Sequence, residues 1–101
     1  MFARTVNRDT VSQPILGQLI RSATSIGANY MEADGAESTK DFIHKIAIAK
    51  KEAKETTHWL RMLAAACPTH RAECRPLWQE AHELTLILSS ILVKCKRDIQ
   101  N

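Results

Sequence analysis

The chain has 101 residues, enough for one domain with a modest core but not for two. Its formal net charge is only +3, it contains no apolar run long enough to cross a bilayer, and its three cysteines follow no export signal. We therefore expect one cytoplasmic domain over residues 1–101 with reduced thiols, and exclude a membrane protein and a disulfide-stapled scaffold.

Only three glycines and three prolines interrupt the chain, and the apolar residues between them recur at helical spacing, which predicts an all-α fold. The first long helix is predicted over residues 13–34, with Ser12 as its N-cap and Gly35 as its stop signal. Its apolar seam is Leu16, Leu19, Ala23, Ile26, Tyr30 and Ala33. Small residues on this helix allow a neighbouring helix to approach closely; they are Gly17, Ala23, Ser25, Gly27 and Ala28.

The second helix is predicted over residues 39–67 and has the clearest heptad pattern in the chain. Ser38 is expected to cap it, Asp41 to complete a capping box, and Pro68 to end it. Its apolar seam is Phe42, Ile46, Ala49, Ala53, Thr56, Leu60, Leu63 and Cys67.

The face opposite this seam is basic. Residues 39–67 carry six Lys and Arg residues against three Asp and Glu residues. A basic stripe of this kind can follow a phosphate backbone, although an ordinary solvated face has the same composition. The candidate nucleic-acid-binding residues are Lys40, Lys51, Lys54 and Arg61.

The third helix is predicted over residues 75–97, with Pro76 in its first turn. Its seam is Leu77, Ala81, Leu84, Leu88, Ile91 and Cys95. Further apolar residues lie off this seam, and a helix that is apolar on more than one face must bury more than one face. The off-seam residues Leu86, Leu92 and Val93 predict an oligomer interface, to which Trp59 and Met62 of the second helix also belong.

Several polar residues are spaced to share helix faces. Asn29 and Glu32 are three residues apart, with Arg21 two turns earlier, and Glu52 and Glu55 flank the seam of the second helix. We predict a structural polar network of these five residues, in which Asn29, Glu32 and one acid of the second helix meet and fix the helix register. The alternative is that these side chains are solvated.

The sequence offers little for catalysis or cofactors. No Ser, His or acidic residue stands in a recognisable nucleophile motif, so we expect no enzyme, no cofactor and no small-molecule substrate. Cys67, His70 and Cys74 have a spacing compatible with zinc ligands, but no second paired motif accompanies them. A small metalloprotein that uses this loop is a minor alternative, and a plain interhelical loop is the favoured interpretation.

Residues 19–63 resemble a family of helical bundles encoded by open reading frames inside bacterial 23S ribosomal RNA intervening sequences. The most specific matches are Ser25-Ile26-Gly27-Ala28-Asn29-Tyr30-x-Glu32-Ala33, then Ser38-x-x-Asp41-Phe42 and Glu52-Ala53-x-Glu55-Thr56. The resemblance covers nearly half of the chain strongly and the last helix by its pattern alone.

The resemblance implies an up-and-down, left-handed, antiparallel four-helix bundle that assembles into homopentameric rings and has no established enzymatic activity. One relative is an accessory protein of diversity-generating retroelements, in which a basic ring binds nucleic acid and a reverse transcriptase. The expected function is therefore a non-enzymatic homo-oligomer that binds RNA as an accessory protein; the alternative is a purely structural scaffold. Family members begin with a full first helix, whereas residues 2–8, "FARTVNR", are expected to form only a shortened one.

Overall fold

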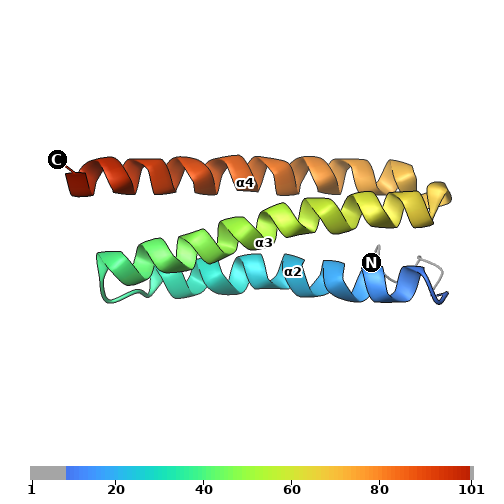
Figure 1. Cartoon of the computed structure of the whole chain (residues 1–101), viewed down its shortest axis with the longest axis horizontal. Coiled ribbons are helices and arrows are strands. Elements are labelled where there is room, and N and C mark those ends of the chain that lie inside the picture. The colour runs from blue at the N-terminus through green and yellow to red at the C-terminus, as the bar shows by residue number, and fades with distance from the viewer. Residues whose placement is uncertain (1–8, 101) are drawn as a thin grey trace.

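The structure of the chain is a computed structural model that describes residues 9–100 (Figure 1). These residues form three long helices, α2 (Ser12–Asp34), α3 (Thr39–Ala66) and α4 (Arg71–Gln100), with a short 3-10 helix η1 (Pro68–His70) before α4. The predicted all-α class is confirmed for this part of the chain. The predicted short helix over residues 2–8 lies outside the described residues, so the count of four helices stays a prediction. None of the described helices is long and apolar enough to cross a membrane.

Helix α2 begins at Ser12, but its capping residue differs from the prediction. The Asp9 carboxylate accepts hydrogen bonds from the backbone N–H groups of Ser12 (2.6 Å) and Val11 (3.0 Å), and these bonds, that of Ser12 above all, lower the pKa of Asp9. Ser12 itself is buried, and its hydroxyl lies 2.9 Å from the Cys67 thiol. The predicted cap was wrong because the Ser12 side chain packs into the core instead of turning back to its own helix.

Helix α3 begins where the sequence predicts. Ser38 has extended backbone angles, and its hydroxyl accepts a hydrogen bond of 3.0 Å from the Asp41 N–H. At the other end the Cys67 N–H donates to the Leu63 carbonyl, and Pro68 follows directly. The predicted Ser38 cap and the proline stop are confirmed.

Helix α4 begins at Arg71, earlier than the predicted start at Arg75, so Pro76 lies inside the helix and not in its first turn. The η1 turn leads directly into α4, and Cys74 is buried against the core in the first turn of the helix. Pro76 has no backbone N–H to donate to the first turn of α4. The burial of Cys74 therefore stabilises this turn. The helix also continues past the predicted end, to Gln100.

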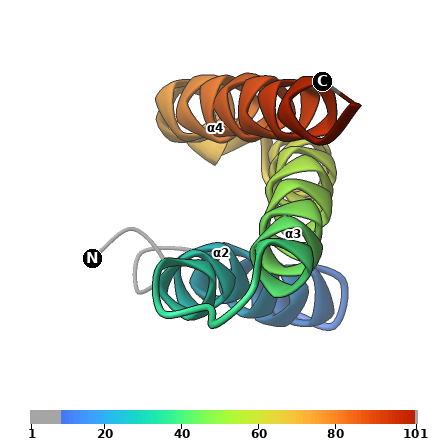
Figure 2. The ribbon, with the colours of Figure 1, turned by 90° about the vertical axis from the view of Figure 1, so that its left-hand side faces the viewer.

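Helices α2 and α4 both pack along α3 and not along each other (Figure 2). Figure 2 looks along the helices and shows α3 joining the two outer helices, which are separated on the other side. Consecutive helices run antiparallel, and the molecule measures 51 × 20 × 19 Å. The fold is an open arrangement of three helices with α3 at its centre.

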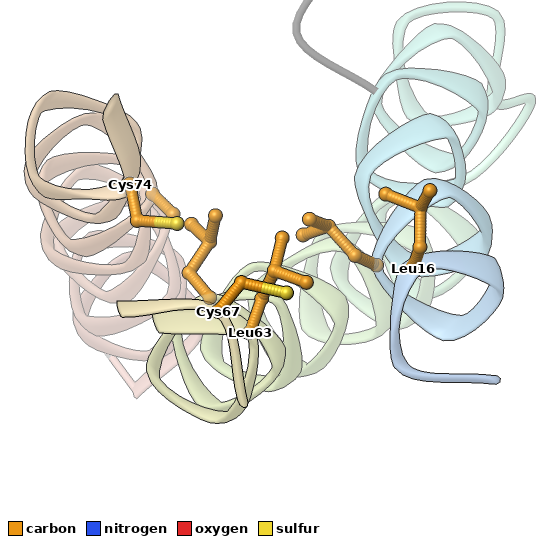
Figure 3. Close-up of a cluster of buried hydrophobic side chains, with 7 residues drawn as sticks. Leu16, Leu63, Cys67 and Cys74 are labelled. Carbon is orange, nitrogen blue, oxygen red and sulfur yellow. The ribbon is translucent and has the colours of Figure 1, made fainter. Parts of the chain in front are cut away.

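The core follows the seam of α3. Ile46 and Leu63, toward opposite ends of that helix, are fully buried. Around Leu63, the side chains of Leu16, Cys67 and Cys74 bring α2 and the first turn of α4 together with α3 (Figure 3). The second cluster, around Ile46, contains Ala33, Ala49, Ala53 and Leu88. The α3 seam predicted from heptad spacing is therefore confirmed.

The predicted seams of the outer helices are only partly buried. In α4, Ala81 and Leu88 are buried, whereas Leu77 and Leu84 are 37% and 40% exposed. In α2, Tyr30 is 53% exposed, although it was predicted to lie in the seam. These positions differ from the prediction because α2 and α4 each have one neighbouring helix in the described structure, so only part of each apolar stripe is covered.

Candidate functional site

An apolar groove of about 520 Å³ lies between α2 and α4 and has α3 as its floor. Ile20, Ala23 and Gly27 line its α2 wall, and Leu77 and Leu84 line its α4 wall. Figure 2 shows these two walls as the helices that α3 holds apart. In a four-helix bundle a further helix fills this position. The groove is therefore one place where the described fold leaves apolar surface uncovered.

The glycines Gly17 and Gly27 of α2 are not explained by close contacts with α3. A Cβ atom added at Gly17 or at Gly27 would meet no heavy atom within 4 Å. Gly27 lines the groove together with Ala23, which is exposed. The sequence predicted that such residues admit a neighbouring helix, and the space beside Gly27 is open to one.

The five residues predicted at an oligomer interface fall into two groups. Met62, Leu86 and Val93 are exposed, by 42%, 55% and 57%. Trp59 and Leu92 are half-buried, and each packs against one of the two core clusters. Only the first group therefore offers its apolar surface fully to another molecule.

The structure brings three of the five predicted network residues together. Arg21 of α2 pairs with Glu52 of α3 at 3.1 Å and with Glu55, one helix turn further on. The Glu52 side chain is 10% exposed, and the Arg21 side chain is 47% exposed. Desolvation lowers the pKa of Arg21, but the hydrogen bonds and charges of Glu52 and Glu55 outweigh it and raise that pKa overall.

Asn29 and Glu32 lie outside this contact. The Asn29 amide donates to the Ser25 carbonyl (2.9 Å) and to the Ser25 hydroxyl, both on its own helix. Glu32 pairs with Lys45 of α3 at 3.1 Å. The predicted meeting of Asn29 and Glu32 with an acid of α3 is not found, because Asn29 reaches back along α2 and the carboxylate of Glu32 takes a cation as its partner.

A buried hydroxyl pair joins α2 and α3 and was not predicted. The Ser22 and Thr56 hydroxyls lie 2.9 Å apart, and both residues are buried. The Ser22 hydroxyl also lies within hydrogen-bond distance of the Leu19 carbonyl, and the Thr56 hydroxyl lies within hydrogen-bond distance of the Glu52 carbonyl. Both hydroxyl protons therefore have acceptors. The available signal was Thr56, the one hydroxyl residue in the apolar seam of α3.

The four predicted basic residues of α3 are all exposed; they are Lys40, Lys51, Lys54 and Arg61. Within residues 9–100, no carboxylate lies at ion-pair distance from any of them, whereas Lys45 is held by Glu32. A shallow hollow of about 540 Å³ lies beside Lys51 and Lys54; Glu55, which is paired with Arg21, also lines it. These cations are therefore open to an anionic partner.

The side chains of the Cys67–Cys74 loop are engaged in packing and in a local pair. Cys67 and Cys74 belong to the core cluster around Leu63, and the Nδ1 atom of His70 lies 2.8 Å from a carboxylate oxygen of Glu73. Across residues 9–100, no group of three His, Cys, Asp or Glu side chains is arranged to hold a metal ion. Residues 9–100 therefore show no ligand set for the metalloprotein alternative.

We expect the three thiols to react with the disulfide reagent DTNB at different rates. Burial raises the pKa of Cys74, and the charge of Glu73 adds to this, so little reactive thiolate forms near neutral pH. Cys67 is also buried, whereas Cys95 is partly exposed. In the folded protein Cys95 should react first, and the other two thiols only after unfolding in urea. A fast phase that survives Cys95→Ser would contradict this prediction.

Comparisons with known proteins agree with the resemblance carried by residues 19–63. Residues 10–90 match the family described as 23S rRNA-intervening sequence protein. A crystal structure from Bacteroides thetaiotaomicron, described as a protein with unknown function from the S23 ribosomal protein family, is 41% identical and superposes with a TM-score of 0.73; the match covers 77% of this chain and 70% of that chain. No curated protein matches the chain. Because the family match spans most of α2, α3 and α4, the chain belongs to the 23S rRNA-intervening sequence protein family.

Proposed function

We propose that the chain is a non-enzymatic, homo-oligomeric scaffold whose copies associate through the groove between α2 and α4. The observation that carries the proposal is the groove, about 520 Å³ of mostly apolar space beside the core. Ile20, Leu77 and Leu84 are 37–40% exposed along its walls. Apolar surface in water is unfavourable, and a large contiguous apolar patch is typical of an interaction site.

The occupant that fits the groove is the outer face of α4 from a second copy. Leu86 and Val93 are exposed there and lie seven residues apart, two turns along one side of the helix. We call these two residues the ridge. Leu84 lines the groove and is only two residues from Leu86, so groove and ridge lie on nearly opposite sides of α4. Each copy therefore presents one apolar groove and one apolar ridge.

A ridge that enters the groove of the next copy makes a heterologous contact. Such a contact leaves a groove free at one end of the pair and a ridge free at the other, so assembly continues until it closes into a ring or extends as a filament. The family resemblance implies a homopentamer, and we propose the ring as the form of this protein.

The proposal assigns no reaction to the groove. Glu80 is the single ionisable residue among the described residues that line it. The Bacteroides relative is described as a protein with unknown function, so it supplies no activity to transfer.

Light scattering after size exclusion tests the assembly on the full chain. We expect an oligomer that persists at moderate salt, because apolar contacts are not screened. Leu84→Glu in the groove and Leu86→Glu in the ridge should each reduce the mass to that of a monomer. Ala65→Glu introduces the same charge at an exposed site of α3 and should leave the mass unchanged. A helical wild-type chain that stays monomeric at every concentration would refute the proposal.

Mixing the two variants distinguishes a heterologous contact from a symmetric one. Leu84→Glu keeps an intact ridge and Leu86→Glu keeps an intact groove, so one contact can form between them. We expect a dimer in the mixture and monomers in the separate samples. If Leu86→Glu assembles by itself as well as the wild type does, the ridge is not the occupant of the groove.

We further propose that the outer face of α3 binds RNA. The supporting observation is the set of exposed cations without an acidic partner in residues 9–100, namely Lys40, Lys51, Lys54 and Arg61. Repetition of this face around a ring would add weak local fields into a stronger one. Binding of this kind releases counterions from the phosphate backbone, so the affinity should fall steeply as salt rises.

Fluorescence anisotropy with a labelled RNA tests this second function. Lys51→Glu combined with Lys54→Glu should abolish binding at moderate salt. Lys94→Glu combined with Lys96→Glu makes the same change of charge at exposed positions of α4 and should weaken binding much less. Equal losses in both double variants, or an affinity that does not depend on salt, would exclude the outer face of α3 as the RNA site.

A further inference from the structure

A third hollow, open to solvent and of about 710 Å³, lies at the end of the molecule where α3 passes through η1 into α4, and we call it the cavity. Leu60 and Ala64 of α3 and Ala72 of α4 contribute apolar surface to it. Leu60 is the one lining residue that it shares with the groove between α2 and α4. Its volume lies within the usual range of small-molecule sites, about 300–1,000 Å³.

Three arginines line this cavity. Arg61 comes from α3, and Arg71 and Arg75 are four residues apart on α4, so their side chains share one helix face. Within residues 9–100, none of the three lies at ion-pair distance from a carboxylate. No acidic residue is among the described lining residues, and the neighbouring Glu73 is paired with His70. Arg61, Arg71 and Arg75 are therefore the only charged side chains among the described lining residues that an anionic group in the cavity would meet.

Trp78 adds an aromatic wall to the cavity. The guanidinium group of Arg61 lies over its ring, with Cζ 5.1 Å from the ring centroid. His82 stacks on the same indole, with the ring centroids 5.0 Å apart and the ring planes 9° from parallel. The first contact holds the planar Arg61 guanidinium against the Trp78 ring at the edge of the cavity. The cavity thus combines a flat apolar and aromatic side with a cationic side.

We propose that this cavity binds a nucleoside phosphate. The phosphate group would accept hydrogen bonds from Arg71 and Arg75, since the guanidinium fork matches the oxygens of a phosphate. The flat base would lie against Arg61 and the apolar wall, because bases stack on guanidinium planes and on apolar and aromatic surfaces. Inorganic phosphate would leave the apolar side in water, and an uncharged ligand would leave the arginines without a counter-charge.

Two sources carry this chemistry, a free mononucleotide and the 5′-phosphorylated end of an RNA strand. The site goes beyond the proposed assembly and does not depend on it, because Arg71 and Arg75 belong neither to the groove nor to the ridge. Arg71 and Arg75 also lie outside the basic face of α3, whereas Arg61 belongs both to that face and to the cavity, so the variants that test the cavity change only Arg71 and Arg75. Failure of the assembly or of RNA binding by α3 can therefore be told apart from failure of this site.

Calorimetric titration of the full chain with AMP tests the proposal. Arg71→Ala combined with Arg75→Ala should weaken AMP binding at least about tenfold, because charge-assisted hydrogen bonds to phosphate are lost. Lys94→Ala combined with Arg97→Ala removes the same charge from exposed positions of the same helix and should retain the affinity. In light scattering, both double variants should have the same mass as the wild-type protein. In a Trp59→Phe background, Trp78 is the single remaining tryptophan, and its fluorescence should change when AMP binds.

A tetraribonucleotide with and without a 5′-phosphate distinguishes the two sources. Binding of AMP assigns the cavity to a free nucleotide, and binding of the phosphorylated tetranucleotide alone assigns it to a strand end; both results uphold the site. Three results would overturn it. They are no binding of either ligand, binding of inorganic phosphate as tight as that of AMP, and equal losses in the two double variants.

Discussion

Leu63→Ala is expected to lower the free energy of unfolding by about 2–5 kcal/mol. Leu63 is fully buried and lies in the cluster where Leu16 of α2 and Cys74 of α4 meet α3. Truncation leaves a cavity bordered by three helices, and tightly packed neighbours from separate helices relax into such a space only in part. The loss would be a large share of the total stability of a small domain, roughly 5–15 kcal/mol.

Urea unfolding followed by circular dichroism measures this effect. All variants should be compared at one protein concentration, because association of copies adds to the apparent stability. Ile99→Ala is the control, since Ile99 is 62% exposed in the last turn of α4 and its truncation should change stability by at most about 0.5 kcal/mol. If Leu63→Ala costs no more than Ile99→Ala, the three helices are not packed around Leu63 as described.

Helical periodicity predicted the buried residues of α3 better than those of α2 and α4, and the reason is physical. Helix α3 has a neighbour on two sides, so every residue of one broad stripe, from Ile46 to Leu63, is buried whichever neighbour covers it. In α2 and α4 the same kind of pattern marks residues such as Ala23 and Leu84 as apolar. It does not say which helix, or which molecule, covers them, and in the described structure they line an open groove.

The polar sites show where sequence patterns stop being informative. Spacing within a helix placed Asn29 and Glu32 on one face, but the partner across the interface depends on how far α2 is shifted along α3. That shift places Arg21, and not Asn29, beside Glu52. The cavity with three arginines was missed because Arg61 is ten residues away from the nearest of the others, and η1 brings them together.

Arg21→Met is the other substitution for which we expect a large loss of stability. It leaves the Glu52 carboxylate, whose residue is only 8% exposed, without its cation at the interface of α2 and α3. Glu52 is the buried member of this pair, and removing its partner lowers stability because the remaining charge stays largely desolvated. Water screens Arg21 itself, which is half exposed, so the loss should be smaller than that of Leu63→Ala.

A double-mutant cycle in urea separates the ion pair from simple packing. Glu52→Leu in the Arg21→Met background should recover much of the loss, because two apolar side chains then meet where one unpaired charge had remained. Glu55→Gln is the matched comparison and should cost less, since the Glu55 side chain is 34% exposed and water can solvate its replacement. If the Arg21→Met and double variants are equally unstable, the charge of Glu52 is not what makes Arg21 necessary.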